Sequence, residues 1–300
     1  MEHRKYLNVT VYRVFDLLNV IFMVSFAIIM IYPFYNQFIL SLNDGVDAAR
    51  GGIYLLPRVF TITNYKMLFE NTNLTKGFLI SVARVLVGTS TSLLATGLLS
   101  YVVTVKNFSG RKFLRVLFIF TMYFSGGLIP FYLLVMNLRL NDTFTVLWLP
   151  SLVNVYYMLI ISSYMQGLPD SIVESARIDG CSEIRIFFQI IAPICKPVFA
   201  AIAIYLCANH WNSWFDSLIY NPSGDLDTLQ VYLRRILLEV EALEKIQDVA
   251  SKNEASEFRN VSSITLRAAT TMVVTLPIVF VYPFFQKYFV GGITMGSVKG

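Results

Sequence analysis

The sequence predicts an all-α membrane protein, a bundle of six transmembrane helices. Three observations support this fold class. Of the 300 residues, 56% are hydrophobic and only 14% are charged, whereas a soluble domain carries about 25% charged residues. The hydrophobic residues form continuous runs of about 20, the length at which a helix crosses a bilayer. These runs do not alternate in polarity as barrel strands do, so we expect helices whose backbone amides bond within their own segment.

The six runs lie at residues 17–40, 78–105, 113–135, 144–165, 198–218 and 264–285. The first run follows basic residues, as the apolar region of a signal peptide does. It is too long for one, however, and no small-residue cleavage site follows it. We therefore expect an uncleaved anchor over about 15–42, core spans over about 78–285, and a single transmembrane domain over residues 1–300.

The charges on the loops predict the orientation of the chain. Six spans place both termini on the same side of the membrane. With the termini inside, the short inner loops carry more Lys and Arg than the short outer loops, and Lys106, Arg111, Lys112 and Arg115 belong to this excess. Because positive residues favour the cytoplasmic side, we predict a multi-pass protein of the plasma or inner membrane with both termini in the cytoplasm.

The second span contains a charged residue and a stripe of small polar ones. Arg84 lies near the outer end of the span, so we expect its side chain to snorkel to the interface. Gly88, Ser92, Thr96 and Ser100 follow at four-residue spacing, which places them on one helix face. Such a face lets a neighbouring helix approach closely. The stripe therefore predicts helix packing rather than a substrate path.

Two polar regions are candidates for a substrate cavity. Asn154 lies well inside the fourth span and either bonds to a neighbouring helix or lines an aqueous cavity. Residues 209–216 read Asn-His-Trp-Asn-Ser-Trp-Phe-Asp. They form either an aromatic belt at the membrane interface or a sugar-binding surface, since aromatic rings stack on the C–H faces of pyranoses and amides bond to hydroxyls. The candidate cavity residues are Asn154, Asn209, Trp211, Asn212 and Trp214.

Residues 167–197, on the cytoplasmic side between the fourth and fifth spans, carry the signals of a short helix. Pro169 is expected to open it. Ser171 and Glu174 have the spacing of a capping box, and Gly180 suits the left-handed residue that ends a helix.

A second short helix is expected to follow, from Ser182 to Pro193. The apolar face predicted for it consists of Ile184, Phe187, Phe188 and Ile191. Helices this short do not fold alone. They must dock against something, and part of their surface could cover the inner ends of the protein's own spans.

The outer loop over residues 216–263 is polar and acidic, and it also contains a helical pattern. Apolar residues recur at helical spacing at Leu229, Leu233, Ile236, Val240 and Leu243. Asp227 and Gln230 form a possible cap pair at its start. This helix either packs on the bundle or lies at the membrane surface.

The sequence contains none of the motifs that are typical of several enzyme classes. There is no GxxxxGK[ST] phosphate loop, no HExxH or GxSxG motif, and no carboxylate well inside a span. Cys181, Cys195 and Cys207 form no CxxC pair, and His3 and His210 are too far apart for a metal cluster. We therefore expect no enzymatic activity, no metal site and no cofactor on this chain.

The run Glu174-Ser-Ala-x-x-x-Gly180, followed by Phe187, Pro193 and Pro197, resembles the EAA loop of ABC-importer permeases. Four other segments share the resemblance, at residues 61–65, 124–130, 211–215 and 286–300. The chain is identified as a member of the carbohydrate ABC-transporter permeases of the maltose-permease (MalG-like) type, and it is most similar to the YtcP-type members. The resemblance covers nearly the whole chain. Ser175 and Cys181 stand where Ala is usual, a small departure in size.

The resemblance implies a type I ABC importer permease fold and a role for the loop over residues 167–197. In the family this loop enters a cleft of a cytoplasmic ATPase. The residues implied in ATPase coupling are Glu174, Ser175, Ala176, Arg177, Asp179 and Gly180. Glu174 has two compatible roles, as a helix cap and as a coupling residue. The tail over residues 286–300 either reaches towards the ATPase dimer or is a frayed basic end, and the loop over residues 216–263 approaches a sugar-binding protein.

The resemblance also implies the partners and the function. The partners are a homologous second permease subunit, two ATPase subunits that carry ATP and Mg, an extracytoplasmic sugar-binding protein, an oligosaccharide substrate and the lipid bilayer, with no nucleic acid. The expected function is the transmembrane permease subunit of an ATP-driven oligosaccharide importer that works by alternating access. The alternative is a secondary sugar transporter or channel that works without an ATPase.

Overall fold

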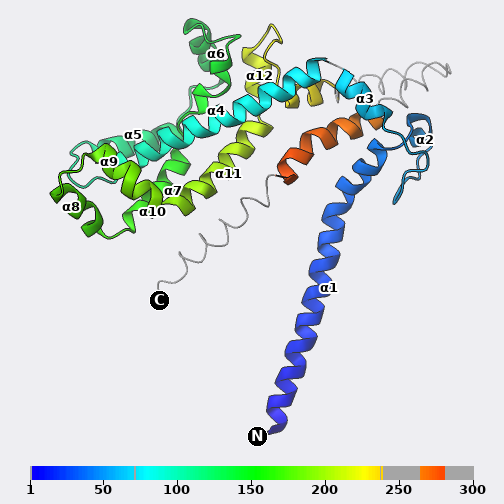
Figure 1. Cartoon of the computed structure of the whole chain (residues 1–300), viewed down its shortest axis with the longest axis horizontal. Helices are drawn as coiled ribbons and strands as arrows, with labels where there is room; N and C mark the ends of the chain where they lie inside the picture. The colour runs from blue at the N-terminus through cyan, green and yellow to red at the C-terminus, as the bar shows by residue number, and fades with distance from the viewer. Residues whose placement is uncertain (1, 71, 237, 239–263, 281–300) are drawn as a thin grey trace. The chain divides into compact units, whose positions relative to one another are not determined.

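The computed structural model describes residues 2–70, 72–236, 238 and 264–280 (Figure 1). Over these residues the regular structure is helical, and the only β pairing is an isolated bridge between Asn43 and Phe60. The helices form two compact units. One comprises Met1–Asn71 with Ile236–Val273, and the other comprises Thr72–Arg235 with Val274–Gly300.

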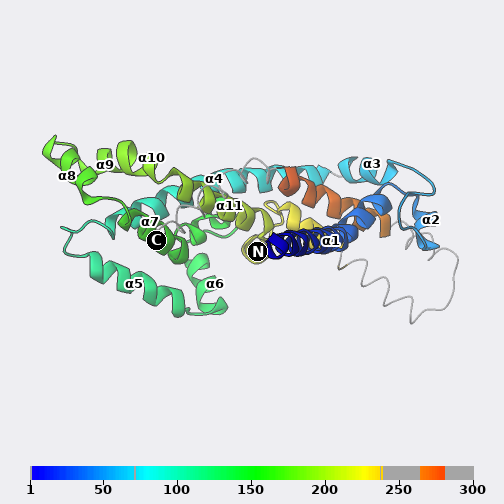
Figure 2. The same ribbon diagram turned by 90° about the horizontal axis from the view of Figure 1, so that it is seen from below.

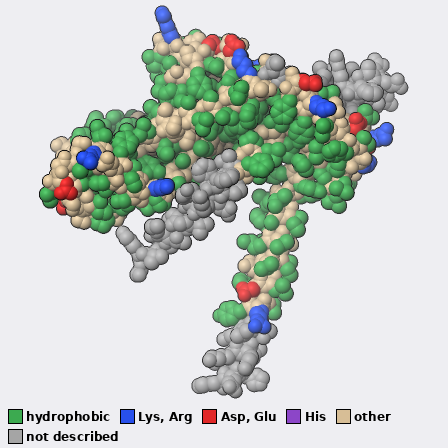
Figure 3. Space-filling view, in the orientation of Figure 1, with side chains coloured by type: hydrophobic (Ala, Val, Ile, Leu, Met, Phe, Trp, Pro, Cys, Tyr) green, Lys and Arg blue, Asp and Glu red, His purple; other side chains and the backbone are tan. Residues whose placement is uncertain are grey.

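The first unit begins with α1 (Glu2–Ser41), a helix of 40 residues. Its apolar part, Tyr12–Ser41, is long enough to cross a membrane and none of its most apolar stretch is buried within the protein. Hydrophobic side chains cover the described surface of this helix (Figure 3). A membrane anchor over about 15–42 would need a helix of this length and composition, and the anchor role stays a prediction.

The end of α1 is held by a network of buried polar side chains. It connects α1 to α2 (Gly45–Ala49), to α3 (Thr63–Glu70) and to the helix Ile264–Phe280. Asn64 Nδ2 donates hydrogen bonds to the carbonyl oxygens of Ser41 and Asn43, both at 3.0 Å, and Asn64 Oδ1 accepts one from the Thr265 hydroxyl at 2.9 Å. Asn64 therefore joins three segments that are distant in sequence.

The second unit is built around α4 (Thr72–Val102), against which α11 (Lys196–Asn212) and α7 (Val155–Gln166) pack (Figure 1). The small polar stripe of α4 lies in these contacts. Ser92, Thr96 and Ser100 are fully buried. The Ser100 hydroxyl donates a hydrogen bond to the Met158 carbonyl of α7 at 3.1 Å. The prediction that this stripe serves helix packing is confirmed.

The third and fourth of the expected spans are broken rather than continuous. The third consists of α5 (Arg111–Tyr123) and α6 (Leu128–Asn137), bent by 116°; Figure 2 shows these two helices. The fourth consists of η1 (Phe144–Leu147), η2 (Leu149–Ser151) and α7, bent by 50°. A further bend of 84° separates α11 from Glu183–Ile194, which lies in the loop over residues 167–197 and not in the expected fifth span. At the first break Gly127 has φ +86°, a backbone conformation that glycine adopts without strain.

The described helices thus include two that are long and apolar enough to cross a membrane, or up to five if each bent pair is one span. The helix Ile264–Phe280 is apolar but shorter. The helical membrane architecture agrees with the expected fold class, and the exact number of six spans stays a prediction. Residues 281–285 of the expected last span and the tail over residues 286–300 lie outside the described residues.

The expected fifth span ends earlier than its predicted limit at residue 218. The helix α11 stops at Asn212, Ser213 is extended, and a separate helix α12 (Phe215–Tyr220) follows. The interruption lies in a run of polar residues, and Asp216, in the first turn of α12, pairs with Arg84 as described below.

The outer-loop helix is present over residues 229–236. Leu229 is fully buried, and its backbone N–H bonds to the Ser81 hydroxyl of α4 at 2.9 Å. The predicted cap pair is wrong in its partners, because the Asp227 carboxylate accepts from Asn221 Nδ2 and pairs with Arg235. Val240 and Leu243 lie outside the described residues.

Candidate functional site

The first helix of the loop over residues 167–197 is α8 (Asp170–Ile178). Pro169 precedes it in an extended conformation and no side chain caps its first turn. The capping box predicted from Ser171 and Glu174 is therefore wrong, since Ser171 already lies inside the helix. Its carbonyl accepts a hydrogen bond from the Ser175 hydroxyl at 2.7 Å. The fixed φ of proline and the acidic Asp170 in the first turn favour the start of the helix instead.

Gly180 ends α8 as the sequence predicts. It has φ +76°, in the left-handed region. The Gly180 N–H bonds to the Arg177 carbonyl and the Cys181 N–H bonds to the Ala176 carbonyl, both at 3.0 Å. These two hydrogen bonds form a Schellman motif, which satisfies carbonyls that a helix end would otherwise leave free.

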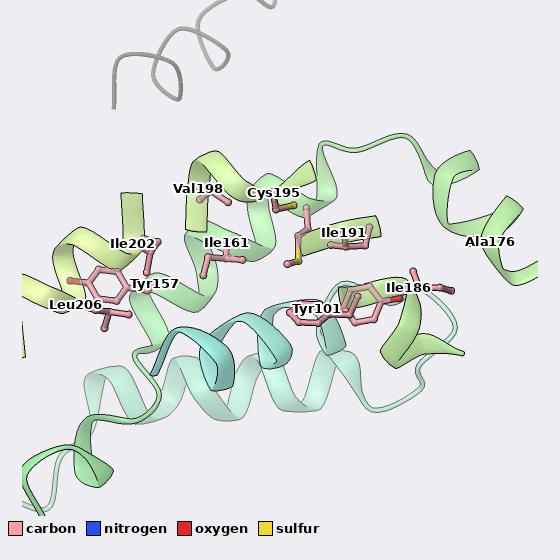
Figure 4. Close-up of a cluster of buried hydrophobic side chains, with 12 residues drawn as sticks. Tyr101, Tyr157, Ile161, Ala176, Ile186, Ile191, Cys195, Val198, Ile202 and Leu206 are labelled. Carbon is pink, nitrogen blue, oxygen red and sulfur yellow. The ribbon is translucent and has the colours of Figure 1, made fainter. Parts of the chain in front are cut away.

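The two sides of α8 differ in burial. Ala176 is only 5% exposed and belongs to a hydrophobic cluster that joins α8 to α7, α11 and the end of α4 (Figure 4). Glu174, Ser175 and Asp179 are exposed, and Ile178 is 86% exposed. One side of α8 is thus fixed in the protein core and the other is open to solvent.

Arg177 lies between these two sides, and its side chain is bonded within the protein. Its Nε donates to Glu183 Oε1 at 2.8 Å, and the Tyr101 hydroxyl at the end of α4 donates to Glu183 Oε2 at 2.5 Å. The hydrogen bond from Arg177 is the main reason that the pKa of Glu183 lies below its usual range. Neither Glu183 nor Tyr101 was among the site residues predicted from the sequence. Only Glu183 could have been found, because it lies just across the Gly180 turn from Arg177.

The second helix of the loop begins at Ser182 as predicted, with its hydroxyl accepting from the Arg185 N–H at 3.4 Å. It continues as α9 (Glu183–Ile186), a π-helical turn (Phe187–Ile191) and α10 (Ala192–Ile194). The predicted end at Pro193 is thus one residue short, because the helix ends at Ile194.

The apolar face predicted for this second helix is only partly right. Ile186, Phe187 and Ile191 are buried, whereas Ile184 is 69% exposed and Phe188 is exposed. Within the π-helical turn the hydrogen bonds run from residue i to i+5, and this spacing keeps Ile186 and Ile191 on the same side. A face drawn with the α-helical period therefore includes the wrong residues.

Three of the five candidate cavity residues are engaged in contacts inside the protein. Asn154 caps α7, with its Oδ1 accepting from the Tyr157 N–H at 3.2 Å, which is neither of the two roles expected for it. Asn209 Nδ2 donates to the Tyr157 hydroxyl at 3.0 Å. Trp211 is only 8% exposed and its Nε1 donates to the Val274 carbonyl at 3.1 Å.

The remaining two candidates are more open. Asn212 is exposed, and Trp214 is partly exposed with the Arg234 guanidinium 3.9 Å from its ring centre. None of the five candidates lines the cavity beside α6 or the cavity beside α8 in the described part of the chain. Their role in a substrate cavity stays a prediction.

Arg84 does not snorkel to the interface. Its side chain is 2% exposed and pairs with the Asp216 carboxylate, and one guanidinium nitrogen also donates to the Ser213 carbonyl at 3.2 Å. A buried guanidinium is stable only when it is paired. The expectation is wrong because this partner comes from the broken end of the fifth span, which sequence reasoning treated as a continuous helix.

The comparisons with known proteins agree with this architecture. The family described as "Binding-protein-dependent transport system inner membrane component" matches residues 88–219. The polygalacturonan/rhamnogalacturonan transport system permease protein YtcP of Bacillus subtilis is 32% identical over 96% of this chain and 99% of its own length. The chain belongs to the ABC-importer permease family.

Other relatives of this permease extend over a similar length. Protein LplC of Bacillus subtilis is 35% identical over 96% of each chain, and the arabinooligosaccharides transport system permease protein AraQ of Halalkalibacterium halodurans is 32% identical over 91% of the permease and 93% of AraQ. A solved bacterial ABC transporter involved in the import of the polysaccharide alginate has the same fold, with a TM-score of 0.81, 24% identity and coverage of 92% and 97% of the two chains. These comparisons favour the ABC permease over the carrier or channel that works without an ATPase.

Proposed function

We propose that this permease is the transmembrane subunit of an ATP-driven importer for oligosaccharides. Membership of the family supports a transport role rather than an enzymatic one. The substrate class is supported by the names of the relatives, two of which are assigned to polygalacturonan or rhamnogalacturonan and to arabinooligosaccharides.

The complete importer would contain a homologous second permease, two ATPase subunits and an extracytoplasmic sugar-binding protein. ATP and Mg would bind to the ATPases and not to this chain. Both termini and α8 would face the cytoplasm, and the loop over residues 216–263 would approach the sugar-binding protein. The tail over residues 286–300 would reach towards the ATPase dimer.

The single observation that carries the coupling role is the two-sided character of α8. Its buried side holds Ala176 in the core, while Glu174 on its exposed side is free to contact a partner. The bonds from Arg177 and Tyr101 to Glu183 connect α8 to the end of α4. A push on the exposed side of α8 is therefore transmitted to the spans as a rigid-body movement.

The proposed transport cycle would use this arrangement. ATP binding would close the ATPase dimer, displace α8 and turn the two permeases outward to receive the sugar. Hydrolysis would return them to the inward-facing state. The sugar path would lie between the two permeases, where Asn212 and Trp214 are the candidates of this chain that are still open to a ligand.

The decisive experiment uses the importer reconstituted with its binding protein and measures ATP hydrolysis and sugar uptake. Glu174→Ala should leave assembly intact and lower the stimulation of the ATPase by sugar-loaded binding protein by about tenfold or more, a coupling free energy of about 1.4 kcal/mol. The matched control is Glu70→Ala, which removes an exposed Glu from the other unit. Full stimulation and uptake in Glu174→Ala would refute the coupling role, and sugar uptake by the permease without any ATPase would refute the proposed function.

A further inference from the structure

A cavity of about 830 Å³ lies beside α8. Its walls come from the end of α4 and the residues that follow it, the start of α5, the end of α7, and α8 itself. Five basic residues line it, and only two acidic ones. The basic residues are Lys106, Arg111, Lys112, Arg115 and Arg177, and the acidic residues are Asp170 and Glu174.

Two of these basic side chains are already paired. Lys106 pairs with Asp170, and Arg177 pairs with Glu183. Within the described part of the chain, Arg111, Lys112 and Arg115 form no ion pair. The Nε of Arg115 is also buried and has no hydrogen-bond acceptor among the described residues. A buried donor normally has an acceptor, so Arg115 Nε can donate a hydrogen bond to a ligand in this cavity.

The rest of the cavity is apolar. Val105, Leu168, Val173 and Ile191 are among its lining residues. Beyond the cavity, α5 exposes Phe113, Val116 and Phe120 directly after its basic first turn. A ligand that fits both features carries a negative charge at one end and hydrocarbon at the other.

We propose that this cavity binds the phosphodiester headgroup of an anionic phospholipid. Arg111, Lys112 and Arg115 hold the phosphate, and the acyl chains lie along the exposed apolar residues of α5. Basic pockets of this kind between membrane helices recognise anionic lipid headgroups. Because Val173 and Glu174 of α8 line the same cavity, the bound headgroup also supports the coupling helix. The inference does not depend on which sugar the importer carries or on how its ATPases are coupled.

The test measures lipid retention on the assembled importer. The complex is placed in nanodiscs of phosphatidylcholine with phosphatidylglycerol, extracted into detergent, and the retained lipids are counted by native mass spectrometry. Wild-type protein should retain phosphatidylglycerol in preference to phosphatidylcholine. Arg111→Gln with Arg115→Gln should weaken this binding roughly 30-fold, the factor that corresponds to about 1 kcal/mol for each basic residue.

Two control variants make the result specific. Arg185→Gln with Lys196→Gln removes the same charge from the same loop region but outside the cavity, and it should retain phosphatidylglycerol as the wild type does. Arg111→Lys with Arg115→Lys keeps the charge and should retain most of the binding. If the Gln variant does not assemble, the wild type decides, because its preference for phosphatidylglycerol must fall as salt is added.

Three results would overturn the proposal. The first is equal retention of phosphatidylglycerol by the wild type and the Gln variant. The second is stabilisation of the detergent-solubilised wild type by inorganic phosphate but not by phosphatidylglycerol, which would indicate a site for a free anion. The third is loss of an ATPase subunit from the Gln variant with unchanged lipid retention, which would indicate that the basic residues contact protein.

Discussion

The side chains of Arg84 and Asp216 pair within the second unit although 132 positions separate them in the sequence. Arg84 comes from the middle of α4, and Asp216 from the first turn of α12, just after the break that follows α11. The same guanidinium also donates to the Ser213 carbonyl at the break. One arginine thus satisfies both a carboxylate and a free backbone carbonyl where the fifth span is interrupted.

Removal of the carboxylate should destabilise the permease strongly. Asp216→Ala leaves the Arg84 guanidinium buried without its charge partner, and we expect a loss of about 3 kcal/mol in the free energy of unfolding. The loss is measured by denaturant unfolding of the purified permease in detergent. The double variant Arg84→Met with Asp216→Leu should recover most of it, because a hydrophobic pair of similar volume leaves no uncompensated charge. A double variant less stable than Asp216→Ala would contradict this account.

The stripe on α4 should be intolerant of added volume at Gly88. A Cβ placed there would lie 2.6 Å from the His210 ring, which is itself buried. We expect Gly88→Ala to lower the free energy of unfolding by about 1–3 kcal/mol through overpacking. Gly126→Ala is the control, since a Cβ there meets only Pro130 at 3.8 Å. Thermal unfolding compares the two, and equal melting temperatures would show that α4 and α11 are not in this contact.

Two helix ends in the loop over residues 167–197 could be predicted, because each depends on a residue at the end itself. Gly180 marks the end of α8 by its positive φ, and Ser182 begins the next helix through its own hydroxyl. The pair Arg84–Asp216 could not be predicted, since it depends on the tertiary arrangement of two spans. The same holds for Trp211, whose aromatic ring suggested a sugar surface but fills the protein interior. The sequence alone does not show whether an aromatic or amide side chain binds a ligand or packs inside the protein.

The candidate coupling residues form two groups, one exposed to solvent and one packed against the spans. The structure leaves Glu174, Ser175 and Asp179 exposed, as a docking role requires. Ala176 and Arg177 instead fix α8 to the spans, through the hydrophobic cluster and through Glu183. A motif in the sequence identifies the whole helix, but only the packing shows which of its side chains are exposed and which are fixed to the spans.

The glycine that ends α8 provides a test of local conformation. A Cβ on Gly180 would meet nothing within 4 Å, but a positive φ is unfavourable for alanine. Gly180→Ala should therefore loosen the end of α8 by about 1 kcal/mol without a clash. Hydrogen exchange of residues 176–181 should rise, and ATPase stimulation should fall. Gly180→Asn should be milder, because Asn tolerates the left-handed region. Identical exchange in the Ala and Asn variants would show that the backbone conformation is not what matters.

The contact between Arg177 and Glu183 should make the stability of the loop over residues 167–197 sensitive to acid. The hydrogen bond from Arg177 holds the pKa of Glu183 below its ordinary value of 4.5. A carboxyl whose pKa is lower in the folded state stabilises the protein above its unfolded pKa and loses this effect as the pH falls through its folded pKa. We therefore expect Glu183→Gln to lower the free energy of unfolding at pH 7 by about 0.5–1 kcal/mol, a modest value because the carboxylate is half exposed to solvent.

The difference in melting temperature between wild type and variant should shrink as the pH falls below 4.5 and vanish once Glu183 is protonated in both states. The control is Glu70→Gln, an exposed Glu in the other unit, which should show no difference at either pH. The difference in melting temperature between wild type and Glu183→Gln could instead stay constant from pH 7 into this acid range. That result would mean that Glu183 acts through the shape of its side chain and not through its charge. The connection from α8 to Tyr101 would then have to be attributed to packing alone.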